Sequence, residues 1–152
     1  MKRLSLHSPL LACIALLASC ATAVHVAAPG EACKAGGYSV TDNFAGARRG
    51  TCRVGGADNV TLEILPEDAE VRNPSPWFAF RIEPDDATSA RITLDYGTWK
   101  HRYQPKISYD GLTWAPLDES SVEVSADSYR ASLDLDLDGR PVWVAAQELV
   151  VP

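Results

Sequence analysis

The sequence is poor in the residue types that build most catalytic and metal sites. It has three histidines, and its single methionine is Met1. Beyond residue 19 the histidines are His25 and His101, and neither begins a His-x-x-Glu or His-x-x-x-His pattern, so a zinc site would need scattered ligands. No serine lies in a nucleophile elbow. We therefore expect no catalytic residues, no bound metal and no cofactor, and predict that the chain is not an enzyme.

Positive charge is also scarce. The sequence has fourteen Lys and Arg and twenty Asp and Glu, which gives a formal net charge of −6 at pH 7. An acidic chain repels phosphate backbones, so we expect no nucleic-acid partner. The length of 152 residues leaves room for one domain.

Long apolar runs are missing except near the N-terminus. Lys2 and Arg3 precede an apolar run over residues 9–18, which is short for a membrane span and typical of a signal peptide. Residues 17–20, Leu-Ala-Ser-Cys, resemble the lipobox of bacterial lipoproteins, in which Cys20 would become the lipidated first residue. Residues 21–23, Ala-Thr-Ala, would instead suit ordinary cleavage before Val24.

We favour the lipobox, with residues 1–19 as the signal peptide. The protein is then expected on the periplasmic side of a bacterial membrane, held by a lipid anchor. Ordinary cleavage would give a soluble periplasmic or secreted protein. Loss of Lys2 and Arg3 moves the net charge from −6 to −8 in either scheme.

Cysteine is limited to four residues, of which Cys13 and Cys20 belong to the N-terminal segment. Cys33 and Cys52 remain, an even pair in an exported protein, and we predict a disulfide between them. Metal binding by the two thiolates is the alternative, but no nearby histidines complete such a site.

Hydrophobic residues recur with a period of two rather than 3.6. Apolar and polar residues alternate in four runs, at 60–64, 78–82, 92–96 and 131–137. This alternation is typical of antiparallel strands with one buried face. Residues 20–36 are expected to be a tether, and residues 37–152 the folded domain.

Turn signals separate the runs at short intervals. They are Gly55-Gly56, Asn73-Pro74, Pro84-Asp85-Asp86, Asp110-Gly111 and Asp138-Gly139. Short strands with regular turns and no helical stripe predict an all-β, antiparallel, jelly-roll-like sandwich of about eight or nine strands.

The Asp110-Gly111 pair predicts a two-residue hairpin with a type I′ turn. That register would pair Tyr109 with Leu112 and Ile107 with Trp114, as an apolar ladder. Residues 108–114 also resemble the Asp-box of sialidase-type propellers, but they are one residue short and occur once, so the hairpin interpretation is preferred.

Residues 134–139, Asp-Leu-Asp-Leu-Asp-Gly, begin like an EF-hand loop. The twelfth position of that loop needs a bidentate acid and is Ala145 here. The intervening leucines favour a strand with an acidic outer face. A weak calcium site of another kind is the alternative.

Aromatic and basic residues gather in one segment of this acidic chain. Such a cluster can stack a sugar or clamp a carboxylate, and aromatics with arginine are enriched at interface hot spots. A solvated strand edge is the alternative. The predicted contact surface consists of Tyr96, Trp99, His101, Arg102 and Tyr103.

Residues 77–82, Trp-Phe-Ala-Phe-Arg-Ile, and residues 106–114, Lys-Ile-Ser-Tyr-Asp-Gly-Leu-Thr-Trp, carry a family likeness. Together with residues 141–146 they resemble the N-terminal β-sandwich domain of cytosolic-carboxypeptidase-like M14 zinc carboxypeptidases. The likeness covers roughly residues 37–150. None of the family's zinc ligands, nor its catalytic glutamate, matches a position of this sequence.

The resemblance implies a non-catalytic accessory domain that docks on a carboxypeptidase catalytic domain and borders its substrate entrance. A stand-alone module that binds an envelope ligand, glycan or peptide, is the second hypothesis. An enzyme with an unrecognised site is the third.

Overall fold

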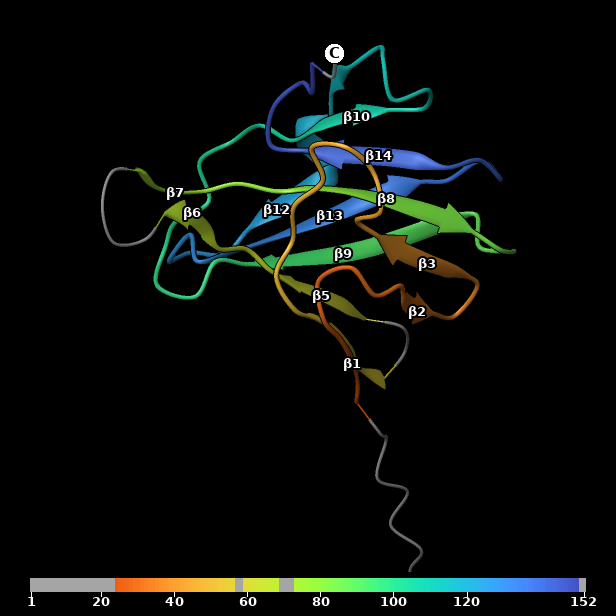
Figure 1. Ribbon diagram of the computed structural model, residues 1–152, viewed down its shortest axis with the longest axis horizontal. Coiled ribbons are helices and arrows are strands. Elements are labelled where there is room, and N and C mark those ends of the chain that lie inside the picture. The colour runs from red at the N-terminus through yellow and green to blue at the C-terminus, as the bar shows by residue number, and fades with distance from the viewer. Residues whose placement is uncertain (1–23, 57–58, 69–72, 151–152) are drawn as a thin grey trace, which may run out of the picture.

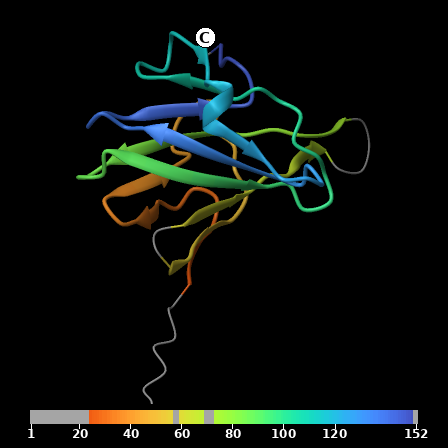
Figure 2. The same ribbon diagram turned by 180° about the vertical axis from the view of Figure 1, so that it is seen from behind.

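The computed structural model describes residues 24–56, 59–68 and 73–150 as two packed β-sheets (Figures 1 and 2). The first sheet has the order β1 (His25–Ala27), β4 (Cys52–Val54), β5 (Val60–Glu63), β9 (Ser89–Asp95), β13 (Arg130–Asp136) and β12 (Val122–Val124). The second has the order β11 (Ala115–Pro116), β10 (Lys106–Ser108), β14 (Val142–Ala145), β8 (Ala79–Pro84), β3 (Tyr38–Thr41) and β2 (Cys33–Ala35). A small hairpin, β6 (Pro66–Asp68) with β7 (Asn73–Pro76), and a 3-10 turn, η2 (Glu119–Ser121), complete it.

The core lies between the two sheets and is formed by the alternating side chains predicted from the sequence. Leu62 of β5 and Leu94 of β9 meet Phe80 and Ile82 of β8 in this core, and all are fully buried. Burial of each such side chain stabilises the fold by roughly 1.5–3 kcal/mol. The prediction of an all-β sandwich is confirmed.

One strand pair departs from the antiparallel prediction. β5 pairs with β9 in parallel, with Val60 beside Ile92 and Leu62 beside Leu94. The chain between them passes through β8 in the other sheet, which makes the crossover that parallel pairing requires. Alternating burial is the same for either strand direction, so the sequence pattern does not distinguish them.

The strands are also more numerous and shorter than expected. The described residues contain fourteen strands, against the eight or nine predicted. Seven of them have two or three residues (β1, β2, β4, β6, β10, β11 and β12), too few to show a period. Residues 73–74, expected to be a turn, form the start of β7.

The predicted tether is wrong for residues 24–36. Residues 25–27 pair with β4, and Cys33–Ala35 pairs with β3, so this stretch supplies an edge strand to each sheet. The alanines and the Pro-Gly pair suggested a tether, and two strands of only three residues are too short to show a hydrophobic period. Residues 1–23, with the proposed signal peptide and Cys20, lie outside the described residues. Over residues 24–56, 59–68 and 73–150, no helix has the length and apolarity that a bilayer crossing demands.

The predicted disulfide between Cys33 and Cys52 is confirmed. Its Cα atoms are 6.2 Å apart and both cysteines are fully buried. Cys33 belongs to β2 and Cys52 to β4, so the bond joins the edge strand of the second sheet to the strand next to the edge of the first sheet. Because its two cysteines belong to different sheets, the disulfide links the two sheets covalently on this side of the sandwich.

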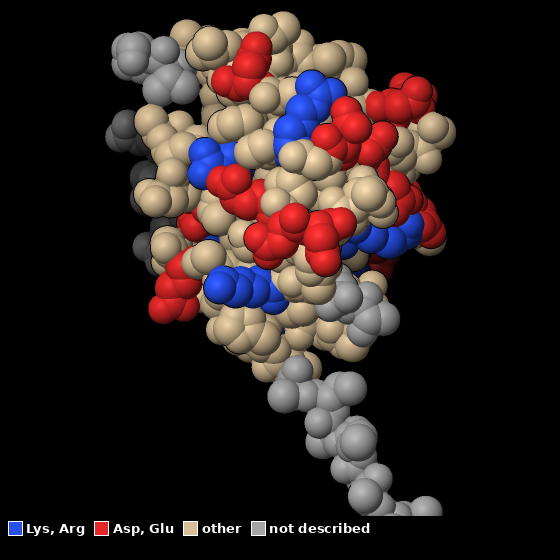
Figure 3. Space-filling view, turned by 90° about the vertical axis from the view of Figure 1, so that its right-hand side faces the viewer, with Lys and Arg blue, Asp and Glu red and all other residues tan. Residues whose placement is uncertain are grey.

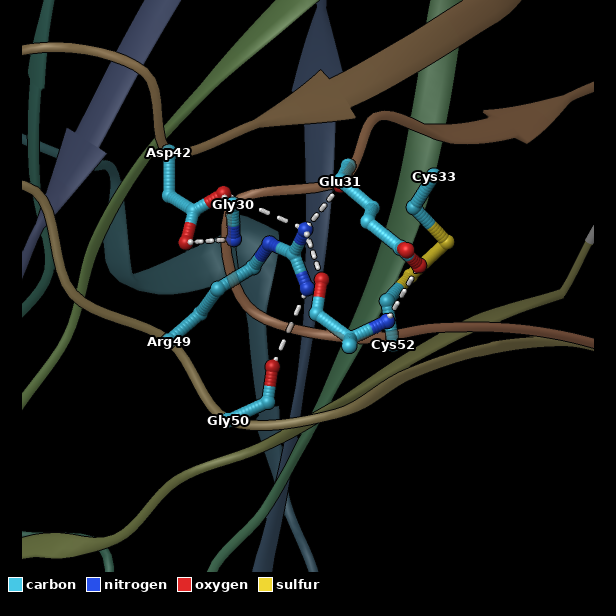
Figure 4. A network of polar contacts seen from close by, with 8 residues as sticks. Gly30, Glu31, Cys33, Asp42, Arg49, Gly50 and Cys52 are labelled. Carbon is cyan, nitrogen blue, oxygen red and sulfur yellow. Dashed lines mark hydrogen bonds and ion pairs between the residues drawn. A yellow bond between two sulfur atoms is a disulfide. The ribbon is translucent and has the colours of Figure 1, made fainter.

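A buried arginine holds the segment between β1 and β2 (Figure 4). The Arg49 guanidinium forms an ion pair with Asp42 at 3.2 Å and donates hydrogen bonds to the carbonyls of Ala28 (3.1 Å), Glu31 and Gly50 (3.0 Å). The Asp42 carboxylate also accepts the amide of Gly30, at 3.0–3.1 Å. One fully buried side chain therefore ties the N-terminal segment to the loop before β4.

The predicted type I′ hairpin is wrong. β10 pairs with β11 so that Ile107 lies opposite Ala115, which leaves a six-residue loop, 109–114. The Asp110 carboxylate accepts the amides of Leu112 (2.8 Å) and Thr113 (2.7 Å) and the Ser108 hydroxyl (3.0 Å). A side chain that satisfies these donors favours a wider loop. Of the two residues expected to have positive φ, only Gly111 does.

The strand interpretation is confirmed for residues 134–136, the last residues of β13. Leu133, Leu135 and Leu137 are buried, whereas Asp134 and Asp136 are exposed. Arg91 of β9 pairs with Asp134 at 2.7 Å, across the ladder. The described residues contain no group of three or more His, Cys, Asp or Glu placed to hold a metal ion.

Candidate functional site

The predicted contact surface lies in the connection between β9 and β10, at one end of the sandwich (Figure 1). Tyr96 does not belong to this surface, because only 1% of it is exposed and its ring is part of the core. It continues the inward-facing side of β9 after Ile92 and Leu94. The same alternation that predicted this strand extends one residue farther and buries the aromatic ring.

Tyr96 and His101 form the internal support of the connection. The Tyr96 hydroxyl and His101 Nδ1 are 2.9 Å apart, and the rings meet edge to face at 5.4 Å. The His101 amide donates to the carbonyl of Ser128 at 2.8 Å. Burial raises the pKa of Tyr96 above its usual range, with a further contribution from Tyr103, and burial lowers the pKa of His101. At neutral pH, this hydrogen bond therefore joins a protonated hydroxyl and an uncharged imidazole.

We expect the protein to lose stability as the pH falls below about 6.5, the usual pKa of histidine. His101 has a lowered pKa in the folded state, so the unfolded chain binds more protons in this range. Unfolding is then favoured as the pH falls. Melting temperatures measured between pH 7.5 and 5.5 should show this slope in the wild type and in His25→Asn. The melting temperature of His101→Asn should depend less on pH, and an unchanged dependence in that variant would show that His101 does not cause it.

The remaining predicted residues differ in exposure. Trp99 and Tyr103 are half-buried and pack against the core, whereas Arg102 is exposed. The Tyr103 hydroxyl lies 2.7 Å from Ser75 Oγ, and Arg102 donates to the same oxygen at 3.1 Å. The exposed part of this segment is therefore Arg102 and Lys100, with the outer edges of the two rings.

Three hollows border this connection. One of about 390 Å³ lies between residues 95–99 and residues 63–65, with Arg53 in its lining. A second, of about 280 Å³, is lined by Tyr103, Ser75, Trp77, Glu67 and residues 147–149. Arg48 lies over the Trp77 ring at 5.8 Å. Another, of about 350 Å³, separates residues 101–104 from β12. Trp77 and Ser75 could not be predicted from the sequence, because they lie more than twenty positions before Tyr103. Only the fold brings β7 and the residues after it beside Tyr103.

The opposite end of the sandwich has a different charge. Figure 3 shows that face, on which acidic side chains gather with fewer basic ones between them. The β8–β9 and β13–β14 turns reach this side, and their exposed acids are Asp85, Asp86, Asp136 and Asp138. Lys100 and Arg102 are exposed cations at the other end, in the β9–β10 connection.

A second aromatic cluster lies beside the 109–114 loop. The Arg140 guanidinium stacks on Tyr109 at 4.1 Å, and Arg81 lies over Trp143 at 5.2 Å. A Cβ at Gly111 would lie 3.4 Å from the Trp143 ring, which is an ordinary van der Waals contact. The positive φ of Gly111 is what favours glycine in this loop.

The same fold occurs in solved structures. A protein described as carboxypeptidase A from Shewanella denitrificans OS-217 is 23% identical, with a TM-score of 0.51. A carboxypeptidase from Burkholderia mallei is 24% identical (TM-score 0.51), and a metallo-carboxypeptidase from Burkholderia cenocepacia is 20% identical (TM-score 0.50). The matches cover 70–74% of this chain and 28–30% of theirs. No family model and no curated protein matched the sequence.

The chain has the fold of part of a carboxypeptidase. The resemblance inferred from residues 77–82 and 106–114 is thereby confirmed at the level of fold. The chain spans less than a third of each of these proteins. Both sequence motifs belong to the second sheet, one in β8 and the two residues before it, the other in the β10–β11 hairpin.

Proposed function

We propose that the protein is a non-catalytic accessory domain that docks on a carboxypeptidase catalytic domain and borders its substrate entrance. The observation that carries this proposal is the coverage of the structural matches, which take in most of this chain but only 28–30% of the carboxypeptidases. The remaining part of those proteins is large enough to hold a separate catalytic domain.

The docking surface is proposed to be the connection between β9 and β10, centred on Arg102. Its guanidinium keeps donors beyond the one used on Ser75, and it is flanked by the half-buried rings of Trp99 and Tyr103. An exposed arginine beside packed aromatic rings is a common arrangement at interface hot spots.

Arg102→Ala should weaken binding to the catalytic domain by about 2 kcal/mol, which is roughly thirtyfold in Kd. The catalytic domain to use is one with a His-x-x-Glu motif, encoded beside this chain in the same genome and co-purified with it. Arg91→Ala is the matched control, because Arg91 is exposed on the outer face of the first sheet. Equal Kd values for the two variants, or no complex with the wild type, would contradict the proposal and favour a stand-alone binding module.

The chain is further proposed to be exported and held at a bacterial membrane by a lipid on Cys20. The support for this lies in the Leu-Ala-Ser-Cys motif that follows the apolar run. Cys20→Ala should release the protein from the membrane fraction and change its mature mass. Membrane association and mass that both match the wild type would exclude lipidation at this residue. Cys13→Ala controls for loss of a cysteine in the leader.

A further inference from the structure

The strand β12 forms a free edge of the first sheet. The Ser125 amide donates to the Arg130 carbonyl at 2.9 Å, so these two residues form a hydrogen-bonded pair. Such pairs alternate along an antiparallel ladder, and Val124 opposite Ala131 is therefore a non-hydrogen-bonded pair. The N–H and C=O of Val124 point away from β13. Among the described residues, no backbone group pairs with them.

This free edge faces a groove rather than open solvent. The groove, of about 350 Å³, has β12 and η2 along one wall and residues 101–104 along the other. The far wall is fixed at both ends, by the His101 amide on Ser128 and by the Gln104 side chain on the Leu117 carbonyl at 2.6 Å. Val124 is 44% exposed at this edge.

The two ends of the groove carry opposite charge. Arg102 and His101 lie at the end near the turn after β12, because His101 is bonded to Ser128. Glu119 lies at the other end, because the Gln104 side chain donates to the carbonyl of Leu117, two positions before Glu119. An occupant that complements both ends has a carboxylate toward Arg102 and a cation toward Glu119.

We propose that this groove binds an extended peptide segment, which adds a strand to the free edge of β12. Its backbone pairs with the N–H and C=O of Val124, and it carries an acidic residue toward Arg102 and a basic residue toward Glu119. Unpaired strand edges are templates for such β-addition, in which backbone hydrogen bonds give affinity and side chains give selectivity. The inference goes beyond the proposed docking and does not depend on it.

A single peptide fits this place better than a second copy of the chain. A second copy would have to bring its whole folded edge past the wall formed by residues 101–104, whereas a peptide brings a single strand. In the symmetric antiparallel register, Glu123 would also lie opposite Glu123 of the second copy, and like charges directly opposite are destabilising.

Val124→Pro tests the proposal, because it removes the N–H that faces the groove and leaves the bonds to β13 in place. Wild type, Val124→Pro and Val124→Ala are to be panned in parallel with a displayed library of random ten-residue peptides. The wild type should enrich peptides with alternating β-branched residues and an Asp or Glu. Binding of that enriched pool should fall by about tenfold or more on Val124→Pro, and by much less on Val124→Ala. Arg102→Glu should deplete the acidic peptides.

A measurement on the wild type guards against misfolding of the proline variant. Exchange of the Val124 amide with solvent, followed by NMR, should slow by about tenfold or more when a peptide from the enriched pool is bound. The proposal is overturned if the library shows no enrichment, or if Val124 exchanges equally fast with and without peptide. A dimer of this chain that Val124→Pro dissociates would also overturn it, because the edge would then be an interface between copies.

Discussion

Replacement of Arg49 by methionine is expected to lower the free energy of unfolding by about 3–5 kcal/mol, the range found when one partner of a buried ion pair is removed. The Arg49 side chain is fully buried. Methionine would leave the Asp42 carboxylate without its cation and remove the guanidinium donors from the carbonyls of Ala28, Glu31 and Gly50. Urea unfolding followed by tryptophan fluorescence would measure the change.

Arg91→Met is the matched control for this prediction. Arg91 also contacts two acids, Glu123 and Asp134, but its side chain is largely exposed. Exposed ion pairs contribute little, so the control should stay within about 1 kcal/mol of the wild type. If Arg49→Met and Arg91→Met unfold at the same urea concentration, the Arg49 network does not stabilise the fold.

Removal of the disulfide in Cys33→Ala with Cys52→Ala is expected to destabilise the fold by about 3 kcal/mol, because the bond closes a loop of 19 residues. The wild type in reductant should unfold at the same urea concentration as the double variant. A thiol assay on denatured, non-reduced protein should find neither cysteine free. Two free thiols in protein taken from an oxidising compartment would contradict the bond.

The two effects should not be additive, because Arg49 and the disulfide hold the same N-terminal stretch, residues 28–33. In the double-cysteine variant, Arg49→Met should cost less than in the wild type, by about 0.5–3 kcal/mol. Equal costs in the two backgrounds would show that they act on separate parts of the fold.

The sandwich architecture could be predicted because the sequence records which side chains are buried. A two-residue period in runs such as 131–137 records which side chains face the core, and that was enough to identify a sandwich. The partner of each strand is a separate question that the pattern does not address. The parallel pairing of β5 with β9 follows from the path of the chain between the two sheets, and the strand β1 is too short to show a hydrophobic period. Neither feature can be predicted from the alternation of apolar and polar residues.

The contact surface was only partly predictable, for a related reason. Aromatic and basic composition marked residues 96–103 as unusual, but composition does not show which way a side chain points. Tyr96 follows β9 inward, and Arg102 points outward. At the 109–114 loop, the dipeptide Asp-Gly suggested a tight turn, whereas the hydrogen bonds to the Asp110 carboxylate set a wider one.

The disulfide between the two sheets also determines how the domain responds to a mechanical pull. A pull applied at the N-terminal end would first unzip β1 from β4, then lift residues 28–32 against Arg49. At Cys33 the force passes through a covalent bond to Cys52 in the other sheet, so peeling cannot continue through residues 34–51. Residues 34–51 therefore add no length under tension from this end, and the load passes directly to β4 and its ladder with β5.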